Sequence, residues 1–347
     1  YWEGKKFADS TLTPPIGSGP YEIANATAGR SITFKLREDY WGRDVPVNKG
    51  RYNFGLIRYD YYRDLGVMFE AFKAGELDFR LENSARNWAT GYNVPAVANG
   101  RLIKETIAHE DPQGMQGFMF NTRRDIFKDV RVRKAIALLM DFEWMNTNLF
   151  YGQYKRSQSY FANSELASSG IPQGNELALL EPFRSQLPAE VFTTPFALPQ
   201  TAGDGNIRAQ MQQAVALLKE AGYELKNGVM TSKATGKPLS FEFLLVQEDF
   251  VRVVQPFTKN LERIGVKARL RVVDSAQYIN RLNDFDFDMI VTSVPNSLSP
   301  GNEQLNFWGS TFADQPGSRN YAGVKNPVVD ALIAQLIKAP AGKTLVD

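Results

Sequence analysis

Short runs in which apolar and polar residues alternate fill the first third of the chain. A period of two predicts β-strands, because successive side chains of a strand point to opposite faces. We expect strands over Tyr21–Ile23, Ser31–Leu36, Tyr52–Tyr62, Leu77–Phe79, Leu102–Ala108 and Gly117–Asn121, the first two paired antiparallel and Leu77–Phe79 buried. Helical spacing predicts helices over Leu65–Lys73, ended by Gly75, and over Val94–Asn99.

A longer helical stripe starts near Asp129. Apolar residues recur there at helical spacing, so Asp129–Leu149 is predicted as a helical region that packs on a core. After residue 210, strands and helices alternate, which indicates an α/β domain with at least some parallel pairing. The expected elements are helix Gln210–Ala221, a hairpin turn at Asn227–Gly228, strand Phe241–Val246, helix Val251–Arg263, strand Val266–Val273, helix Ala276–Leu282, strand Phe287–Thr292 and helix Val328–Ile337.

Two long stretches, residues 152–206 and 293–323, show little periodicity. The first is rich in Ser, Gly, Pro, Asn and Gln. Long irregular segments inside compact domains often carry functional residues. We therefore look for binding residues in these two stretches.

Composition narrows the classes of function. The chain has 347 residues, 40 basic and 38 acidic, with a formal net charge of +2. A balance this close argues against nucleic acid as a partner, because phosphate binding needs a basic surface. The chain has no cysteine, which removes disulfides and thiolate chemistry. No window reaches the roughly 18 apolar residues of a membrane helix, and no signal peptide is visible.

Few residues are suited to catalysis. His109 is the only histidine, and no G-x-S-x-G motif accompanies it, so a serine triad has no support. A second histidine for a zinc-protease motif is also lacking. We interpret His109 as an ordinary loop residue. The pair Asp286 and Asp288 is expected to cap a strand. No catalytic residue, metal site or cofactor is predicted.

Several motifs, in order along the chain, resemble the periplasmic peptide-, dipeptide- and nickel-binding proteins of ABC importers, solute-binding family 5. These motifs are Gly17–Tyr21 (G-[ST]-G-P-Y), Tyr40–Gly42 with Pro46 (N-x-x-Y-W-G-x-x-P in the family, with three residues between Gly and Pro here), Ala74–Asp78 (A-G-E-x-D), Asn121 with Ile126–Ala135, Ala214–Gly222, Leu261–Val266 and Phe287–Asp288. Each motif is weak alone, but their shared order over nearly the whole chain is specific. The stretches Ser297–Gln304 and Gly317–Tyr321 most resemble the Yej-type peptide-binding proteins.

The resemblance implies an α/β fold of the two-lobed periplasmic-binding-protein type II class, with mixed β-sheets. Residues 1–115 would be the remaining part of lobe I, residues 116–290 would be lobe II, and residues 291–347 would cross back to lobe I. Because the G-[ST]-G-P-Y signature lies well inside family members, the chain is expected to lack an N-terminal part and to bind ligand weakly alone.

The function implied is capture of oligopeptides or peptide-like compounds, including peptide antibiotics and cell-wall peptides, without catalysis. The lobes would close about a hinge. The expected partners are the ligand and the membrane permease subunits of an ABC importer, and the protein is expected to be a monomer. The implied location is the periplasm of a Gram-negative bacterium, reached by secretion across the inner membrane.

One departure from the family concerns the ligand. Many oligopeptide binders carry W-x-x-D after the Phe-Asp strand, and its Asp holds the ammonium of the ligand. Val294 and Ser297 occupy those positions here. The ligand is then amino-blocked, branched or unusual, or another carboxylate such as Glu303 takes the role.

The irregular segments and the first crossover supply the candidate ligand-binding residues. A peptide site needs polar groups for the ligand backbone and apolar or water-filled pockets for its side chains. Arg319 is a candidate for pairing with a ligand carboxylate, and we place Trp41 in the core. The candidates are Gln113, Gln116, Tyr160, Phe161, Asn163, Asn296, Ser297, Ser299, Asn302, Glu303, Arg319 and Asn320.

Two other classes stay open. A secreted hydrolase acting on peptides or muropeptides would use carboxylates such as Glu303 and Asp314, and turnover would distinguish it from a binding protein. A receptor or adhesion module with no transported ligand would show repeats or exposed apolar patches. No repeat is present in the sequence.

Overall fold

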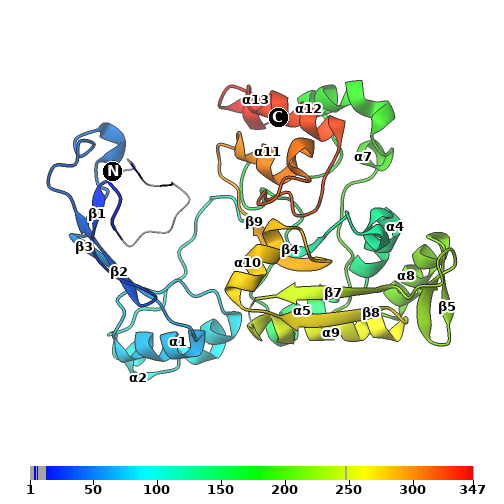
Figure 1. Ribbon diagram of the computed structural model, residues 1–347, viewed down its shortest axis with the longest axis horizontal. Helices are drawn as coiled ribbons and strands as arrows, with labels where there is room; N and C mark the ends of the chain where they lie inside the picture. The colour runs from blue at the N-terminus through cyan, green and yellow to red at the C-terminus, as the bar shows by residue number, and fades with distance from the viewer. Residues whose placement is uncertain (1–3, 5, 7–12, 247, 347) are drawn as a thin grey trace. The chain divides into compact units, whose positions relative to one another are not determined.

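The computed structural model describes residues 4, 6, 13–246 and 248–346. It divides into two compact units (Figure 1). Unit 1 comprises Tyr1–Asn83 and Tyr92–Lys104, and unit 2 comprises Ser84–Gly91 and Glu105–Asp347. No helix among the described residues is long and apolar enough to cross a membrane.

A three-stranded antiparallel sheet forms the first part of unit 1. Its strands follow the order β1-β2-β3, with β1 at Tyr21–Thr27, β2 at Ser31–Leu36 and β3 at Leu56–Asp60. The predicted antiparallel pairing of the first two strands is confirmed. Helix α1 (Leu65–Ala74) is also confirmed. It begins after Asp64, which accepts a hydrogen bond from the Val67 amide at 2.8 Å, and ends at Gly75, whose φ of 86° is left-handed.

Three predictions for the first part of the chain are wrong. Neither Leu77–Phe79 nor Leu102–Ala108 forms a strand, and Phe79 is 80% exposed. A short run of alternating residues forms a strand only where a second strand is in place to pair with it, and the pattern alone does not ensure that. Trp41 is 74% exposed rather than in the core, and its Nε1 donates to the Ser18 carbonyl at 2.9 Å. The remaining short helices of unit 1 are η1 at Pro46–Asn48 and α2 at Pro95–Ala98.

Unit 1 has a small core. Phe69 and Tyr92 are the only buried apolar side chains in its described part, and their rings meet edge to face at 5.1 Å. The Tyr92 hydroxyl donates to Glu82 at 2.8 Å, and burial together with that carboxylate raises the pKa of Tyr92 to about 12. Large apolar side chains such as Phe54, Leu56 and Leu81 are exposed instead.

This contrast predicts unequal local stability. Because buried apolar area is the main stabilising contribution in folding, we expect the amides of α1 and β2 to exchange faster than those of β7 in unit 2. Hydrogen exchange followed by mass spectrometry measures this difference. Equal protection of β2 and β7 would contradict it.

Unit 2 is built on a mixed four-stranded sheet (Figure 1). Its order is β4-β9-β7-β8, where β4 is Met115–Phe120, β9 is Met289–Val294, β7 is Ser240–Leu245 and β8 is Lys267–Val272. Strand β7 runs parallel to β8 and to β9, whereas β4 runs antiparallel to β9. The predicted α/β domain with parallel pairing is confirmed.

Helices and a hairpin complete unit 2. The hairpin joins β5 (Tyr223–Lys226) to β6 (Val229–Ser232) through the predicted turn at Asn227–Gly228, where both residues have positive φ. The helices are η2 at Asn87–Gly91, α3 at Asp125–Lys128, α4 at Val130–Ala137, α5 at Phe142–Leu149, α6 at Gly174–Leu180, η3 at Glu181–Gln186, α7 at Glu190–Thr193, α8 at Arg208–Glu220, η4 at Glu248–Phe250, α9 at Val251–Arg263, α10 at Ser275–Asn283, α11 at Glu303–Trp308, η5 at Ser310–Phe312, α12 at Pro327–Leu336 and α13 at Lys343–Val346.

The sheet of unit 2 is covered on both faces. Phe241 and Phe243 of β7 belong to the larger core with residues of α4, α8 and α9. Leu244 of the same strand points to the other face and packs with Tyr278 and Leu282 of α10. A strand buried on both faces is typical of α/β proteins.

The predicted helical region Asp129–Leu149 is two helices. It breaks after α4, because the Asp141 carboxylate accepts the Trp144 amide at 3.1 Å and starts α5 as its N-cap. The two stretches predicted to be irregular contain short helices, α6 and α7 in the first and α11 in the second.

Candidate functional site

Three segments of unit 2 that are distant in sequence meet through hydrogen bonds. We call them the loop cluster: residues 109–116, 159–164 and 293–304. The Gln113 amide donates to the Ala162 carbonyl at 2.7 Å. The Asn163 side chain donates to the carbonyls of His109 and Asp111 at 2.9 and 3.0 Å. Asn163 adopts a φ of 69°, a left-handed conformation that Asn tolerates better than most residues.

The third segment joins the other two through Asn296. Its side-chain nitrogen donates to the Tyr160 carbonyl at 2.6 Å, and its oxygen accepts from Gln304 Nε2 at 2.9 Å. Gln304 is 3% exposed and also donates to Glu303 Oε1 at 3.2 Å. A buried side-chain amide holds its hydrogen-bond partners in place, because burying the amide without partners would cost folding free energy.

Strand pairing explains why the first and third segments lie together. Gln116 of β4 is paired with Ser293 of β9, and both side chains are exposed. Just before β4, a Cβ on Gly114 would lie 3.0 Å from Ser293 Oγ and 3.2 Å from the Val294 carbonyl. A glycine therefore permits the close approach of the two segments at this point.

Aromatic rings border the loop cluster. The Tyr160 ring meets the Trp308 ring at 4.7 Å between centroids, and burial raises the pKa of the Tyr160 hydroxyl. Phe161 is half-buried, and its amide donates to Ser159 Oγ at 3.1 Å. The Tyr160 hydroxyl is neutral at physiological pH, so these rings offer an apolar surface with one polar group.

The segment before α11 presents polar side chains. Ser297, Ser299 and Asn302 are exposed, and the Ser299 amide donates to Ser297 Oγ at 3.3 Å. The Glu303 carboxylate accepts the Gly301 amide at 2.8 Å. Burial alone would raise the pKa of Glu303, but the hydrogen bonds from the Gly301 and Glu303 amides and from Gln304 outweigh it and lower the pKa.

Arg319 and Asn320 differ in accessibility. Arg319 is exposed, its amide donates to Asn306 Oδ1 at 3.0 Å, and its guanidinium lies 5.7 Å from the centroid of the Phe307 ring. Asn320 is fully buried, and its side chain bonds the Gly309 carbonyl and both the amide and carbonyl of Val324. The side-chain amide of Asn320 is therefore engaged in hydrogen bonds within the fold.

Within the described residues, Asp286, Asp288 and Asp314 each have a charged partner, whereas Glu303, the other carboxylate named for a hydrolase, is held by hydrogen bonds alone, among them those from Gly301 and Gln304. Arg124 pairs with Asp286 at 3.1 Å and with Asp288 at 3.0 Å, and Asp288 accepts the Glu242 amide at 2.9 Å. Asp314 pairs with Lys325. Within the described residues, no group of three or more His, Asp or Glu side chains is placed to hold a metal ion.

Two residues of this region were not singled out from sequence. Gln304 lies inside the polar stretch 297–304, but its burial is not visible in a one-dimensional pattern. Arg123 donates to the carbonyls of Ala313, Asn320 and Tyr321 and lies 3.8 Å from the centroid of the Phe285 ring. Its place two residues after the motif residue Asn121 is the only sequence signal for it.

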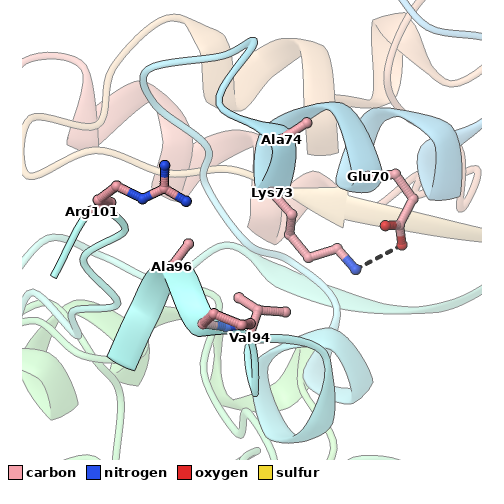
Figure 2. A pocket seen from close by; sticks show the side chains of 7 residues that line it. Glu70, Lys73, Ala74, Val94, Ala96 and Arg101 are labelled. Atoms are coloured by element: carbon pink, nitrogen blue, oxygen red, sulfur yellow. Dashed lines mark ion pairs between the residues drawn. The ribbon is translucent and has the colours of Figure 1, made fainter. Parts of the chain in front are cut away.

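A separate hollow lies within unit 1 (Figure 2). It has a volume of about 380 Å³ and contains none of the predicted ligand-binding residues. Lys73 pairs with Glu70 at 2.7 Å on one side, Arg101 extends from the other, and Val94 and Ala96 form the floor. The hollow is lined by charges of both signs, from Glu70, Lys73 and Arg101, and this lining indicates no particular ligand.

The comparisons with known proteins agree with this architecture. The chain matches the family "Bacterial extracellular solute-binding proteins, family 5 Middle" over residues 1–315, and it belongs to that family. It is 45% identical over 349 residues to the "Probable peptide-binding protein YejA" of Agrobacterium fabrum, covering 98% of this chain and 57% of that protein. It is 43% identical over 343 residues to the "Peptidoglycan-binding protein YepA" of the same species, covering 96% of this chain and 56% of that protein.

A solved structure supports the fold. The oligopeptide-binding protein AppA from Bacillus subtilis, in complex with a nonapeptide, matches with a TM-score of 0.70 at 19% identity, covering 96% of this chain and 57% of that chain. The expected mixed α/β fold of the two-lobed type II class is confirmed. The chain spans little more than half the length of these relatives.

Proposed function

We propose that this chain is part of the extracytoplasmic solute-binding component of an ABC importer and captures oligopeptides or peptide-like compounds. Membership of solute-binding family 5 supports the class of function. The names of the two relatives, one peptide-binding and one peptidoglycan-binding, support peptides or cell-wall peptides as the ligand. One structural observation carries the proposal: hydrogen bonds bring the three segments of the loop cluster together.

The loop cluster has the chemistry that a peptide ligand requires. Exposed polar side chains, among them Gln113, Gln116, Ser297 and Asn302, offer donors and acceptors to a ligand backbone. The Tyr160 and Trp308 rings offer apolar contact. Bridging waters would let such a surface accept different side chains. Asn320 would act indirectly, by holding the backbone next to Arg319.

Hinge closure is the proposed mode of capture. A hinge is expected where the chain crosses between the predicted lobes, near residues 115 and 291. The assignment of residues 1–115 and 291–347 to lobe I and of residues 116–290 to lobe II stays a prediction. We further propose a periplasmic monomer that delivers its ligand to membrane permease subunits.

Capture is proposed to proceed without catalysis. The family and the names of the relatives indicate a binding protein rather than an enzyme. Asp286, Asp288 and Asp314 are engaged in ion pairs. Nothing among the described residues or the comparisons favours the hydrolase alternative.

Mass spectrometry of bound compounds tests the proposed function. We expect the complete gene product, purified without refolding and then denatured, to release peptides or peptide-like compounds. Incubation with a peptide mixture should raise the melting temperature and leave every peptide intact, because ligand binding stabilises the folded state by mass action. Cleavage of the peptides would support a hydrolase, and release of nothing with no thermal shift would contradict capture of peptides.

A further inference from the structure

The outer strand of the unit 2 sheet carries a row of basic side chains. Strand β8 pairs with β7 alone, so its other edge has no neighbouring strand among the described residues (Figure 1). Lys267, Arg269 and Arg271 are exposed and occupy alternate positions of β8, so they lie on one face of the sheet. On the opposite face, Ala268 and Leu270 pack against the larger core.

The basic row is only partly neutralised by acidic neighbours. Arg271 lies 3.8 Å from Glu242 of β7, and the same carboxylate pairs with Arg281 at 3.0 Å. Lys267 and Arg269 form no ion pair within 4.0 Å in the part of the chain that the structure describes. Because one carboxylate is shared between two arginines, the row keeps an excess of positive charge.

The open edge of β8 also offers backbone groups. The Lys267 amide donates to the Leu239 carbonyl at 3.0 Å, so every second residue from Lys267 directs its backbone groups toward β7, as in a parallel ladder. The amides and carbonyls of Ala268, Leu270 and Val272 therefore point to the open edge. Within the described chain these three amides donate to no carbonyl outside the sheet. Such an edge is a template for a further strand.

A hollow of about 370 Å³ lies beside the start of β8. Glu262 and Gly265 line it together with Lys267 and Arg269, so the two cations outnumber the one carboxylate. Leu225 is 57% exposed and lies against Gly265, where a Cβ would be 2.7 Å from Leu225 Cδ1. The hollow can admit a side chain of a segment that lies along β8.

The charges of the row select the kind of strand that can pair there. Charged residues on edge strands prevent proteins from pairing with their own copies. Two β8 strands side by side would bring basic side chains opposite each other, and like charges in that position are destabilising. Opposite charges on paired strands attract, with Cβ atoms about 4.5 to 5.5 Å apart. The row therefore disfavours a second copy of this chain and favours an acidic strand.

We propose that the open edge of β8 is a docking site for an extended acidic segment of another polypeptide, which adds to the sheet as a fifth strand. The backbone of Ala268, Leu270 and Val272 pairs with the segment, and its alternate Asp or Glu side chains meet Lys267 and Arg269. A lipid surface would meet the charges without using these directional backbone groups. The site shares no residue with the loop cluster, and the inference does not rest on the proposed function.

A fluorescent peptide of alternating glutamate and valine tests the docking site on the complete gene product. We expect fluorescence anisotropy to show binding at low ionic strength and several-fold weaker binding at physiological salt, because salt screens exposed charges. The same peptide with every backbone amide methylated cannot donate to β8, and a peptide of alternating lysine and valine has the wrong charge. Both should bind about tenfold more weakly or less.

Substitutions on the strand locate the bound peptide. Lys267→Gln and Arg269→Gln should each weaken binding by about two- to fivefold, since exposed ion pairs contribute modestly. Arg208 and Lys219 are exposed basic residues of helix α8, so Arg208→Gln and Lys219→Gln are the matched controls and should leave binding unchanged.

Exchange of individual backbone amides distinguishes strand addition from charge attraction alone. The bound peptide should slow hydrogen exchange at Ala268, Leu270 and Val272, whose amides point to the open edge. The Arg269 amide faces β7 and should exchange at an unchanged rate. Mass spectrometry with fragmentation to single residues measures both.

Three results would overturn the docking site. The first is equal binding of the methylated peptide, or no protection of the three edge amides. The second is displacement of the probe by the peptide mixture used to test capture, which would place the probe at the proposed ligand site. The third is binding of phosphatidylglycerol vesicles through Lys267 and Arg269 without binding of the acidic peptide, which would assign the row to a membrane surface. Capture of peptides would stand or fall separately from each of them.

Discussion

Replacing Gly265 with alanine is expected to lower the free energy of unfolding by about 2 to 5 kcal/mol. Gly265 follows helix α9 in a Schellman motif. Its φ is 81°, its amide donates to the Glu262 carbonyl at 2.9 Å, and the Val266 amide donates to the Leu261 carbonyl at 3.1 Å. A left-handed φ costs an alanine about 1 to 2 kcal/mol.

Crowding adds to the cost at this position. A Cβ on Gly265 would lie 2.8 Å from the Gly228 carbonyl oxygen and from the Met230 amide nitrogen. Both are backbone atoms of the β5–β6 hairpin, and the Met230 amide donates to the Gly265 carbonyl at 2.8 Å. Relief of the clash therefore requires the hairpin to move away from α9. Overpacking of this kind costs about 1 to 3 kcal/mol.

Gly236 supplies the matched control. Its φ is 67°, and a Cβ there would meet nothing within 4 Å. Gly236→Ala should therefore show only the backbone cost, about 1 to 2 kcal/mol. Urea denaturation of both variants, followed by circular dichroism, measures the difference. Equal losses would show that the contact with the hairpin contributes nothing.

The sequence predicted the second half of the fold better than the first. After residue 210, strands and helices alternate with distinct periods, and turn residues such as Asn227 and Gly228 separate them. In unit 1, Asp78 and Phe79 of the alternating run Leu77–Phe79 are exposed, and the run pairs with no strand among the described residues. Local pattern cannot tell a buried strand from an exposed segment when so little apolar area is buried nearby.

The candidate site was only partly predictable. Irregular, polar composition pointed to the stretches that supply Tyr160, Asn296 and Glu303. The hydrogen bond from Asn296 to the Tyr160 carbonyl links residues 136 positions apart, and no local pattern encodes such a contact. The burial of Asn320 and Gln304 was not predicted either, because polar residues are usually exposed. Their roles in binding stay predictions.

Arg123→Met is expected to lower the free energy of unfolding of unit 2 by about 2 to 4 kcal/mol. The guanidinium joins the strand end at Asn121 to the carbonyls of Ala313, Asn320 and Tyr321. Methionine fills a similar volume but cannot donate, so these carbonyls lose their partner. Each unpaired, largely buried carbonyl costs about 1 to 3 kcal/mol, less where water enters.

Lys128→Met is the matched control for this substitution. Lys128 is 64% exposed and, within the part of the chain that the structure describes, pairs only with Asp125, one helical turn away, so its loss should change stability by no more than about 0.5 kcal/mol. Thermal unfolding of the two variants measures the contrast. A loss at Arg123 no larger than that at Lys128 would contradict the anchoring of residues 313–321.

The same substitution should also affect ligand binding. Arg123 holds the Asn320 carbonyl at 2.8 Å, and Asn320 directly follows Arg319. In Arg123→Met the backbone at Arg319 loses an anchor, so the guanidinium pays more entropy to meet a ligand carboxylate. We expect the folded variant, assayed well below its melting temperature, to bind peptides with a free carboxyl end more weakly, while the same peptides with the carboxyl end amidated are nearly unaffected. Equal weakening of both forms would show a general disturbance of the fold rather than a loss of order at Arg319.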